Sequence, residues 1–92
     1  MNKATFPLPD VNGNIFLPGL DRPVPAVVAN AIQTLGNNCL WPFGQTQLKD
    51  VLEQTKFPLT ADELCSILVA WCGLSEETAK SRSSFLNAVH NQ

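Results

Sequence analysis

The helical pattern is clearest in residues 60–73, which read TADELCSILVAWCG. The first four letters form a capping box, in which the Thr60 hydroxyl and the Glu63 carboxylate satisfy free backbone N–H groups at the start of a helix. Apolar side chains then recur at helical spacing from Leu64, at Ile67, Leu68, Trp71 and Cys72. This spacing predicts a helix with a broad apolar face. A helix with so broad an apolar face is buried on two sides, so we expect it at the centre of the fold.

A further helix is predicted directly downstream. Gly73-Leu74 breaks the central helix, Ser75 caps the next one, and helical spacing continues to about His90. Within the helix pair Leu64–Val89, the stretch from Cys65 to Ser84 resembles the helix-turn-helix of small DNA-binding regulators, in which a glycine opens the turn and a polar residue caps the recognition helix. That resemblance implies a dimeric transcriptional regulator. Its DNA-contacting residues would be Ser75, Lys80, Ser81 and Arg82.

Several residues depart from the helix-turn-helix pattern. Val69 stands where the family has a small residue, and Arg82 stands where it has an apolar one. Glu76 and Glu77 occupy the end of the recognition helix that would approach the phosphates. An antiparallel helix pair inside a bundle accounts for the same residues, so we prefer the bundle and keep DNA binding as the alternative.

Two more helices are predicted upstream of residue 60. The first begins near Asp21 or Val24, has prolines only in its first turn, and ends with a left-handed turn at Gly36-Asn37. The second covers residues 45–56 and ends at Phe57-Pro58. The apolar stripes of the two helices consist of Val24, Val28, Ile32 and Leu35 in the first and Leu48, Val51 and Leu52 in the second.

Residues 1–20 differ from the rest because they are rich in proline and lack helical spacing. Asn12-Gly13 is a strong signal for a tight β-turn, so a small hairpin is predicted there within an otherwise extended arm. The expected fold is therefore all-α: a compact bundle of about four helices preceded by this arm. Residues 1–92 form a single small domain, with the arm at 1–20 and the helical core at 21–92.

Composition and motifs exclude several functional classes. The net charge is −2 and only 15% of the residues are charged, so the chain as a whole has no electrostatic footprint for nucleic acid. No secretory signal or membrane span is evident, and we expect a cytoplasmic protein. The sequence contains no catalytic motif, and its one histidine is His90, near the end of the chain. We therefore expect no enzyme, no cofactor and no small-molecule substrate.

The three cysteines, Cys39, Cys65 and Cys72, contain no CxxC pair. Cys65 and Cys72 lie seven residues apart in one predicted helix, so their Cα atoms are about 10 Å apart. This separation is too long for a disulfide and unsuited to a shared zinc ion. Reduced, mostly buried thiols and no metal site are the prediction.

An unusually apolar stretch, CLWPFG, covers residues 39–44 and is predicted to be a loop. Tryptophan is enriched among residues that dominate binding energy, and a proline-stiffened segment loses little entropy when it docks. We therefore expect a non-catalytic regulator, inhibitor or adaptor that binds a protein partner, or a second copy of itself. The expected binding residues are Leu40, Trp41, Phe43, Phe16 and Leu17.

Overall fold

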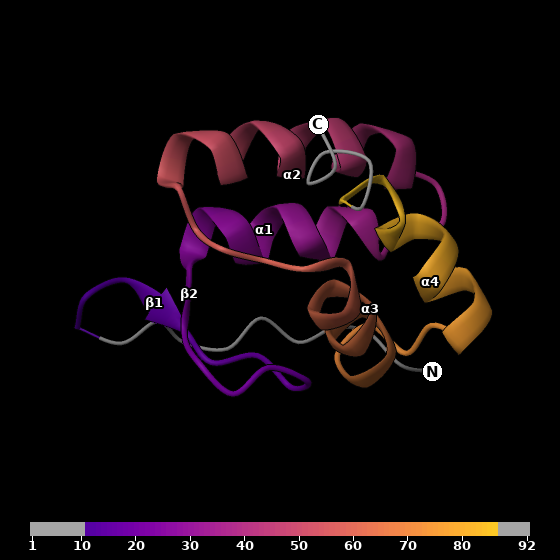
Figure 1. Ribbon diagram of the computed structural model, residues 1–92, viewed down its shortest axis with the longest axis horizontal. Coiled ribbons are helices and arrows are strands. Elements are labelled where there is room, and N and C mark those ends of the chain that lie inside the picture. Colours follow the sequence, from indigo (N-terminus) through magenta and orange to yellow (C-terminus); the bar gives the residue numbers. More distant parts are fainter. Residues whose placement is uncertain (1–10, 87–92) are drawn as a thin grey trace.

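The protein is described by a computed structural model over residues 11–86. This part of the chain forms four helices and one small antiparallel sheet (Figure 1). The elements in chain order are β1 (Asn14–Ile15), β2 (Val24–Pro25), α1 (Ala26–Leu35), α2 (Trp41–Thr55), α3 (Ala61–Ala70) and α4 (Glu76–Ser83). The prediction of a mainly helical fold with about four helices is confirmed, whereas residues 1–10 of the predicted arm lie outside the described part.

The helices pack as two pairs (Figure 1). Helices α1 and α2 run side by side in opposite directions, while α3 is seen nearly end-on beneath them and packs against α4. The sheet lies at the start of α1, and α4 lies near its end. The apolar core sits between these elements. It consists of Ile15, Leu17, Val24, Val28, Ala29, Ala31, Ile32, Leu35, Leu48, Leu59, Leu64, Ile67, Leu68, Trp71, Ala79 and Leu86.

Helix α3 begins and ends as its sequence predicts. The Glu63 backbone N donates to Thr60 Oγ1 at 3.1 Å, and the Thr60 backbone N donates to Glu63 Oε1 at 3.1 Å, which completes the capping box. Gly73 takes a positive φ of 74° just beyond the helix, which glycine tolerates without strain. Leu64, Ile67 and Leu68 have no exposed surface. The predicted buried apolar face of α3 is therefore confirmed, but its predicted central position is wrong, because α3 lies beneath α1 and α2 and packs mainly against α4 (Figure 1).

The small sheet does not form across Asn12-Gly13. Ile15 pairs with Val24 and Asn14 pairs with Pro25, so the strand that follows Asn12-Gly13 takes its partner from beyond the next loop. Burial explains this pairing, because Ile15 and Val24 are both fully enclosed by the core. The first strand of the hairpin predicted at Asn12-Gly13 would precede residue 11 and lies outside the described residues, whereas Ile15 and Leu17 of the predicted arm belong to the core.

Both ends of α1 also differ from the prediction. The helix begins only at Ala26, because Val24–Pro25 is a strand, and Pro25 stands at the N-cap position. At the other end Gly36 is right-handed, with a φ of −77°, so the predicted left-handed turn is wrong. Glycine is needed at this place for space, since a Cβ on Gly36 would lie 2.5 Å from the Sγ of Cys72. The close approach of the end of α3 to the end of α1 therefore requires a glycine at position 36.

Helix α4 is interrupted within its predicted range. Ser75 caps it by accepting from the Thr78 backbone N at 3.2 Å, as expected, but the helix ends at Ser83. The hydroxyls of Ser83 and Ser84 donate to backbone carbonyls one turn earlier, a bonding pattern that bends helices. Helical structure resumes at Phe85, and the predicted end near His90 lies outside the described residues. None of the described helices is long and apolar enough to cross a membrane.

Candidate protein-binding surface

The apolar stretch predicted as a loop is the first turn of α2. The helix begins at Trp41, and Pro42 stands in its first turn, where a missing N–H costs nothing. The turn that precedes it is held by Asn37, whose Oδ1 accepts from the backbone N of Cys39 at 2.8 Å and of Leu40 at 3.2 Å. The prediction of a loop at residues 39–44 is therefore wrong for most of the stretch, which is anchored in regular structure.

This turn lies directly on the end of α1. Gly44 is buried, and a Cβ at this position would lie 2.5 Å from the backbone N of Leu35 and 2.7 Å from its Cα. Because the two helix backbones approach so closely, the first turn of α2 has a fixed orientation relative to α1.

Two large apolar side chains of this turn point into solvent. Leu40 is 50% exposed and Phe43 is 65% exposed. Leu40 is the N-cap residue of α2 and Phe43 stands in the first turn of the helix, so the two positions are close together in the chain. We call the pair the Leu40–Phe43 surface. Hydrogen bonds of the Asn37 turn and of the first turn of α2 hold the backbone that carries this surface.

Trp41 plays a different part in the same turn. Its side chain is half-buried against the core, and the guanidinium of Arg82 lies over its ring at 5.4 Å from the centroid. This cation–π contact links the start of α2 to α4. The tryptophan predicted as a binding anchor is therefore mainly engaged with its own protein, and Phe43 has the exposed aromatic ring.

Arg82 is buried, with only 8% of its surface exposed. Nη1 donates to the Leu35 carbonyl at 3.1 Å, and Nη2 donates to Asn38 Oδ1 at 2.7 Å. The Leu35 carbonyl belongs to the last turn of α1, where the helix dipole favours a cation. Gln45 donates in turn to the Arg82 carbonyl at 3.3 Å. The side chain thus joins three segments of the fold and is not presented to a nucleic acid.

Of the other residues that would contact DNA in the alternative function, one caps a helix and two are exposed to solvent. Ser75 serves as the cap of α4, as described above, whereas Lys80 and Ser81 are exposed. Glu76 and Glu77 are also exposed, in the first turn of the same helix. Two carboxylates therefore stand at the end of α4 that would meet a phosphate backbone.

The arm residues expected to take part in binding are placed elsewhere. Phe16 is 60% exposed, but Leu17 is only 3% exposed and belongs to the core. Phe16 directly follows β1, and the sheet lies at the start of α1 (Figure 1), whereas Leu40 and Phe43 belong to the N-cap and first turn of α2, which packs on Leu35 at the end of α1. Since α1 has 10 residues, about 15 Å of helix separates the two places. They do not form one surface.

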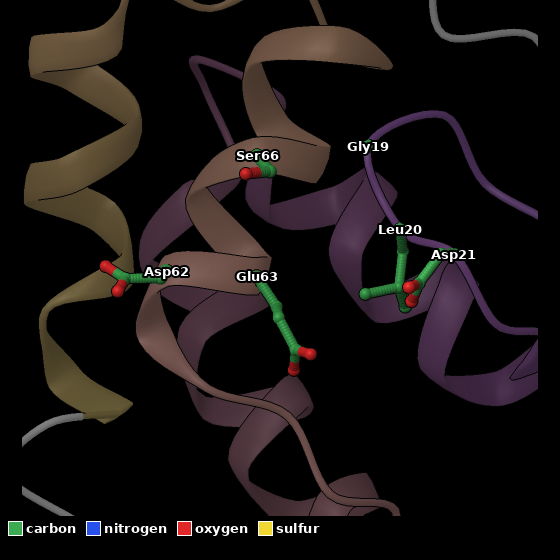
Figure 2. A pocket seen from close by; sticks show the side chains of 6 residues that line it. All are labelled: Gly19, Leu20, Asp21, Asp62, Glu63 and Ser66. Carbon is green, nitrogen blue, oxygen red and sulfur yellow. The ribbon is translucent and has the colours of Figure 1, made fainter.

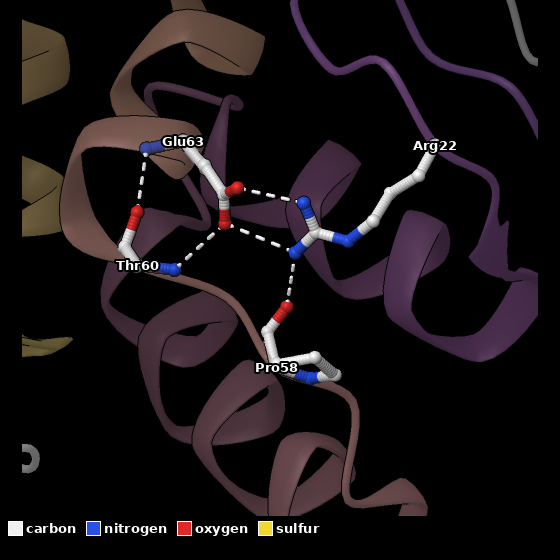
Figure 3. Close-up of polar contacts among 4 residues, drawn as sticks. All are labelled: Arg22, Pro58, Thr60 and Glu63. Carbon is white, nitrogen blue, oxygen red and sulfur yellow. Dashed lines mark hydrogen bonds and ion pairs between the residues drawn. The ribbon is translucent and has the colours of Figure 1, made fainter.

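A contact that sequence patterns did not reveal joins the segment before β2 to the start of α3 (Figure 3). Arg22 donates from Nη1 to Glu63 Oε2 at 2.6 Å and from Nη2 to Oε1 at 3.0 Å, and it also donates to the Pro58 carbonyl. Its guanidinium lies over the Phe57 ring. The Arg22 hydrogen bonds, together with those from Thr60, lower the pKa of Glu63 to about 2.

Glu63 also lines a shallow depression of about 440 Å³ beside α3, together with Asp21, Asp62, Gly19, Leu20 and Ser66. Its three carboxylates do not converge. Figure 2 shows the side chain of Asp62 directed toward α4, away from Asp21 on the opposite wall. Within residues 11–86 no group of three or more histidine, cysteine or acidic side chains is arranged to hold a metal ion. The carboxylates of the depression are therefore not gathered in the way that a metal site requires.

The cysteines do not form a reactive group either. Cys39 is exposed, contrary to the prediction of mostly buried thiols, whereas Cys65 and Cys72 are half-buried. Burial raises the pKa of the Cys72 thiol to about 11, an effect that the nearby Arg82 charge only partly offsets. Cys72 is therefore protonated at neutral pH and is a weak nucleophile.

No known protein family, curated protein or solved structure matches this chain.

Proposed function

We propose that this protein acts by binding another protein through the Leu40–Phe43 surface, as a small non-catalytic regulator, inhibitor or adaptor. The observation that carries the proposal is the exposure of two large apolar side chains within four residues of the chain, Leu40 at 50% and Phe43 at 65%. Folding gains little from leaving two such side chains in water, and exposed apolar patches commonly mark interaction sites.

The rigidity of the turn supports the same proposal. Pro42, the Asn37 turn and the packing of Gly44 on α1 hold the backbone, so little conformational entropy is lost when a partner docks. The Leu40–Phe43 surface is therefore preorganised. An aromatic side chain presented in this way is typical of the few residues that dominate the free energy of binding.

The test replaces Phe43 and compares it with a matched position. Phe43→Ser removes the exposed ring, whereas Val27→Ser removes an apolar side chain that is 50% exposed in the first turn of α1. Both variants should keep the wild-type circular dichroism and melting temperature. We expect Phe43→Ser to weaken partner binding at least tenfold and Val27→Ser to leave it within twofold.

Binding is measured with a photo-crosslinking amino acid at position 40 in nuclease-treated native extract, followed by titration of the purified partner. Sedimentation of the protein alone shows whether the partner is a second copy, because Phe43→Ser would then convert a dimer to a monomer. If the crosslinked partner binds Phe43→Ser and wild type equally well, or if Val27→Ser weakens binding as much, the Leu40–Phe43 surface is not the site. If every partner captured in untreated extract is lost after nuclease treatment, the result favours DNA as the ligand instead of a protein.

A further inference from the structure

A second candidate site lies toward the other end of α2. It is a groove of about 310 Å³ between the last turns of α2, the segment that follows, and Leu86. Leu59 and Leu86 are buried, at 2% exposure each, and Leu52 and Phe57 are half-buried. These apolar side chains form the floor of the groove. Its volume is at the lower end of the range of about 300–1,000 Å³ for ligand sites.

The edge of the groove along α2 has positive charge. Lys49, Glu53 and Lys56 all line it and all are exposed. Among the described residues the ion pair is that of Arg22 with Glu63. Neither Lys49 nor Lys56 therefore lies within ion-pair distance of Glu53. Two of the three lysines in residues 11–86 thus stand at one groove, in a chain whose net charge is −2.

The positions of the lysines define the shape of a ligand. Lys49 and Lys56 are seven residues apart in sequence, which corresponds to about 10 Å along the helix axis. In an extended polyproline-like peptide, three residues span about 9 Å and return to the same face. Two carboxylates three residues apart in such a peptide therefore match the two lysines, and the threefold rotation of the chain turns one of the two apolar residues between them toward the floor.

We propose that this groove binds an extended segment of a partner protein in which two acidic residues, three positions apart, bracket apolar side chains. The inference goes beyond the proposed function, because the groove and the Leu40–Phe43 surface are separate: Phe43 and Leu52 are nine residues apart, or about 13 Å along α2. Electrostatic attraction to the lysines selects the acidic segment, and burial of its apolar residues against Leu52 and Phe57 holds it.

The experiment titrates the full chain, isotopically labelled, with defined peptides and follows backbone amide shifts by NMR. The probe is a pool of tetrapeptides blocked at both ends, with Asp at the first and fourth positions and Leu, Ile, Met or Phe between. Two control pools replace the acidic residues with Lys or the apolar residues with Ser. We expect saturable shifts near Leu52 and Phe57–Leu59 with the acidic apolar pool, and affinities at least tenfold weaker for both controls.

Variants of the chain complete the test. Lys49→Glu combined with Lys56→Glu should weaken binding at least tenfold and reduce its salt dependence, whereas Lys80→Glu on α4 should change it less than twofold. Phe43→Ser should leave peptide binding unchanged, so failure here is distinguishable from failure of the proposed function. The proposal is overturned if no saturable shift occurs at millimolar peptide, if the basic pool binds equally, or if the shifts map outside the groove. Absence of binding because residues 87–92 or a second copy fill the groove would also overturn it.

Discussion

The buried guanidinium of Arg82 is the contact on which we expect stability to depend most sharply. It is enclosed at 8% exposure, and its hydrogen-bonding partners are the Leu35 carbonyl and Asn38 Oδ1. Neither partner is charged, and no carboxylate therefore compensates the free energy of desolvating the cation. That cost is offset by these two hydrogen bonds and by the ring of Trp41. Arg82→Met keeps much of the apolar stem and removes all three contacts.

The magnitude follows from the groups left behind. Hydrogen bonds to a charged group contribute about 1.5–3 kcal/mol each, and the cation–π contact contributes about 1 kcal/mol. Relief of the desolvation of the cation returns part of this sum. We therefore expect Arg82→Met to lower the free energy of unfolding by about 2–3 kcal/mol. With a urea m-value of about 1 kcal/mol/M, the unfolding midpoint should fall by about 2–3 M.

Urea unfolding followed by circular dichroism and tryptophan fluorescence measures the effect. Arg82→Lys should be intermediate, because an ammonium group keeps the charge but lacks the planar fork that reaches both acceptors. The matched control is Lys80→Met on the same helix, which replaces an exposed cation and should change the free energy of unfolding by less than about 0.5 kcal/mol. A double-mutant cycle with Asn38→Ala should give a coupling of about 1 kcal/mol. Equal midpoints for Arg82→Met and Lys80→Met would refute the reasoning.

Two further variants test other contacts. Glu63→Gln removes the carboxylate whose pKa is lowered to about 2 by Arg22. The contribution of this ionised carboxylate to the free energy of unfolding is fully present above about pH 4.5 and is lost as the pH falls toward 2. Both side chains of the pair are about one-third exposed, so solvent screening limits its contribution to about 1 kcal/mol, and unfolding at pH 7 and pH 2.5 should show a smaller acid effect in Glu63→Gln than in wild type. Equal acid sensitivity of the two proteins would contradict this role. Gly44→Ala introduces a Cβ 2.5 Å from the backbone N of Leu35, so it should destabilise by about 1–3 kcal/mol although alanine is the better helix former. Thr46→Ala, at an exposed position of α2, is its control in thermal melts, and a stable Gly44→Ala would show that α1 and α2 do not meet so closely.

The sequence determined by itself those features whose partners lie within one or two turns of each other. The Thr60–Glu63 capping box, the Ser75 cap, the break at Gly73 and the buried face of α3 were all predictable, because spacing along one helix fixes which groups meet. The number of helices followed from the same local patterns.

Only the tertiary structure decided how segments far apart in the chain use each other. Arg82 and Leu35 are 47 residues apart, Arg22 and Glu63 are 41 apart, and nothing in their local sequence indicates either contact. The same holds for Gly36 against Cys72 and for the pairing of Ile15 with Val24. For the site, the sequence identified the apolar turn but not which of its side chains are exposed. In the packed chain Trp41 is half-buried and lies against Arg82, whereas Leu40 and Phe43 are in solvent. Exposure of a side chain depends on which other elements cover it, and that is a property of the packed chain.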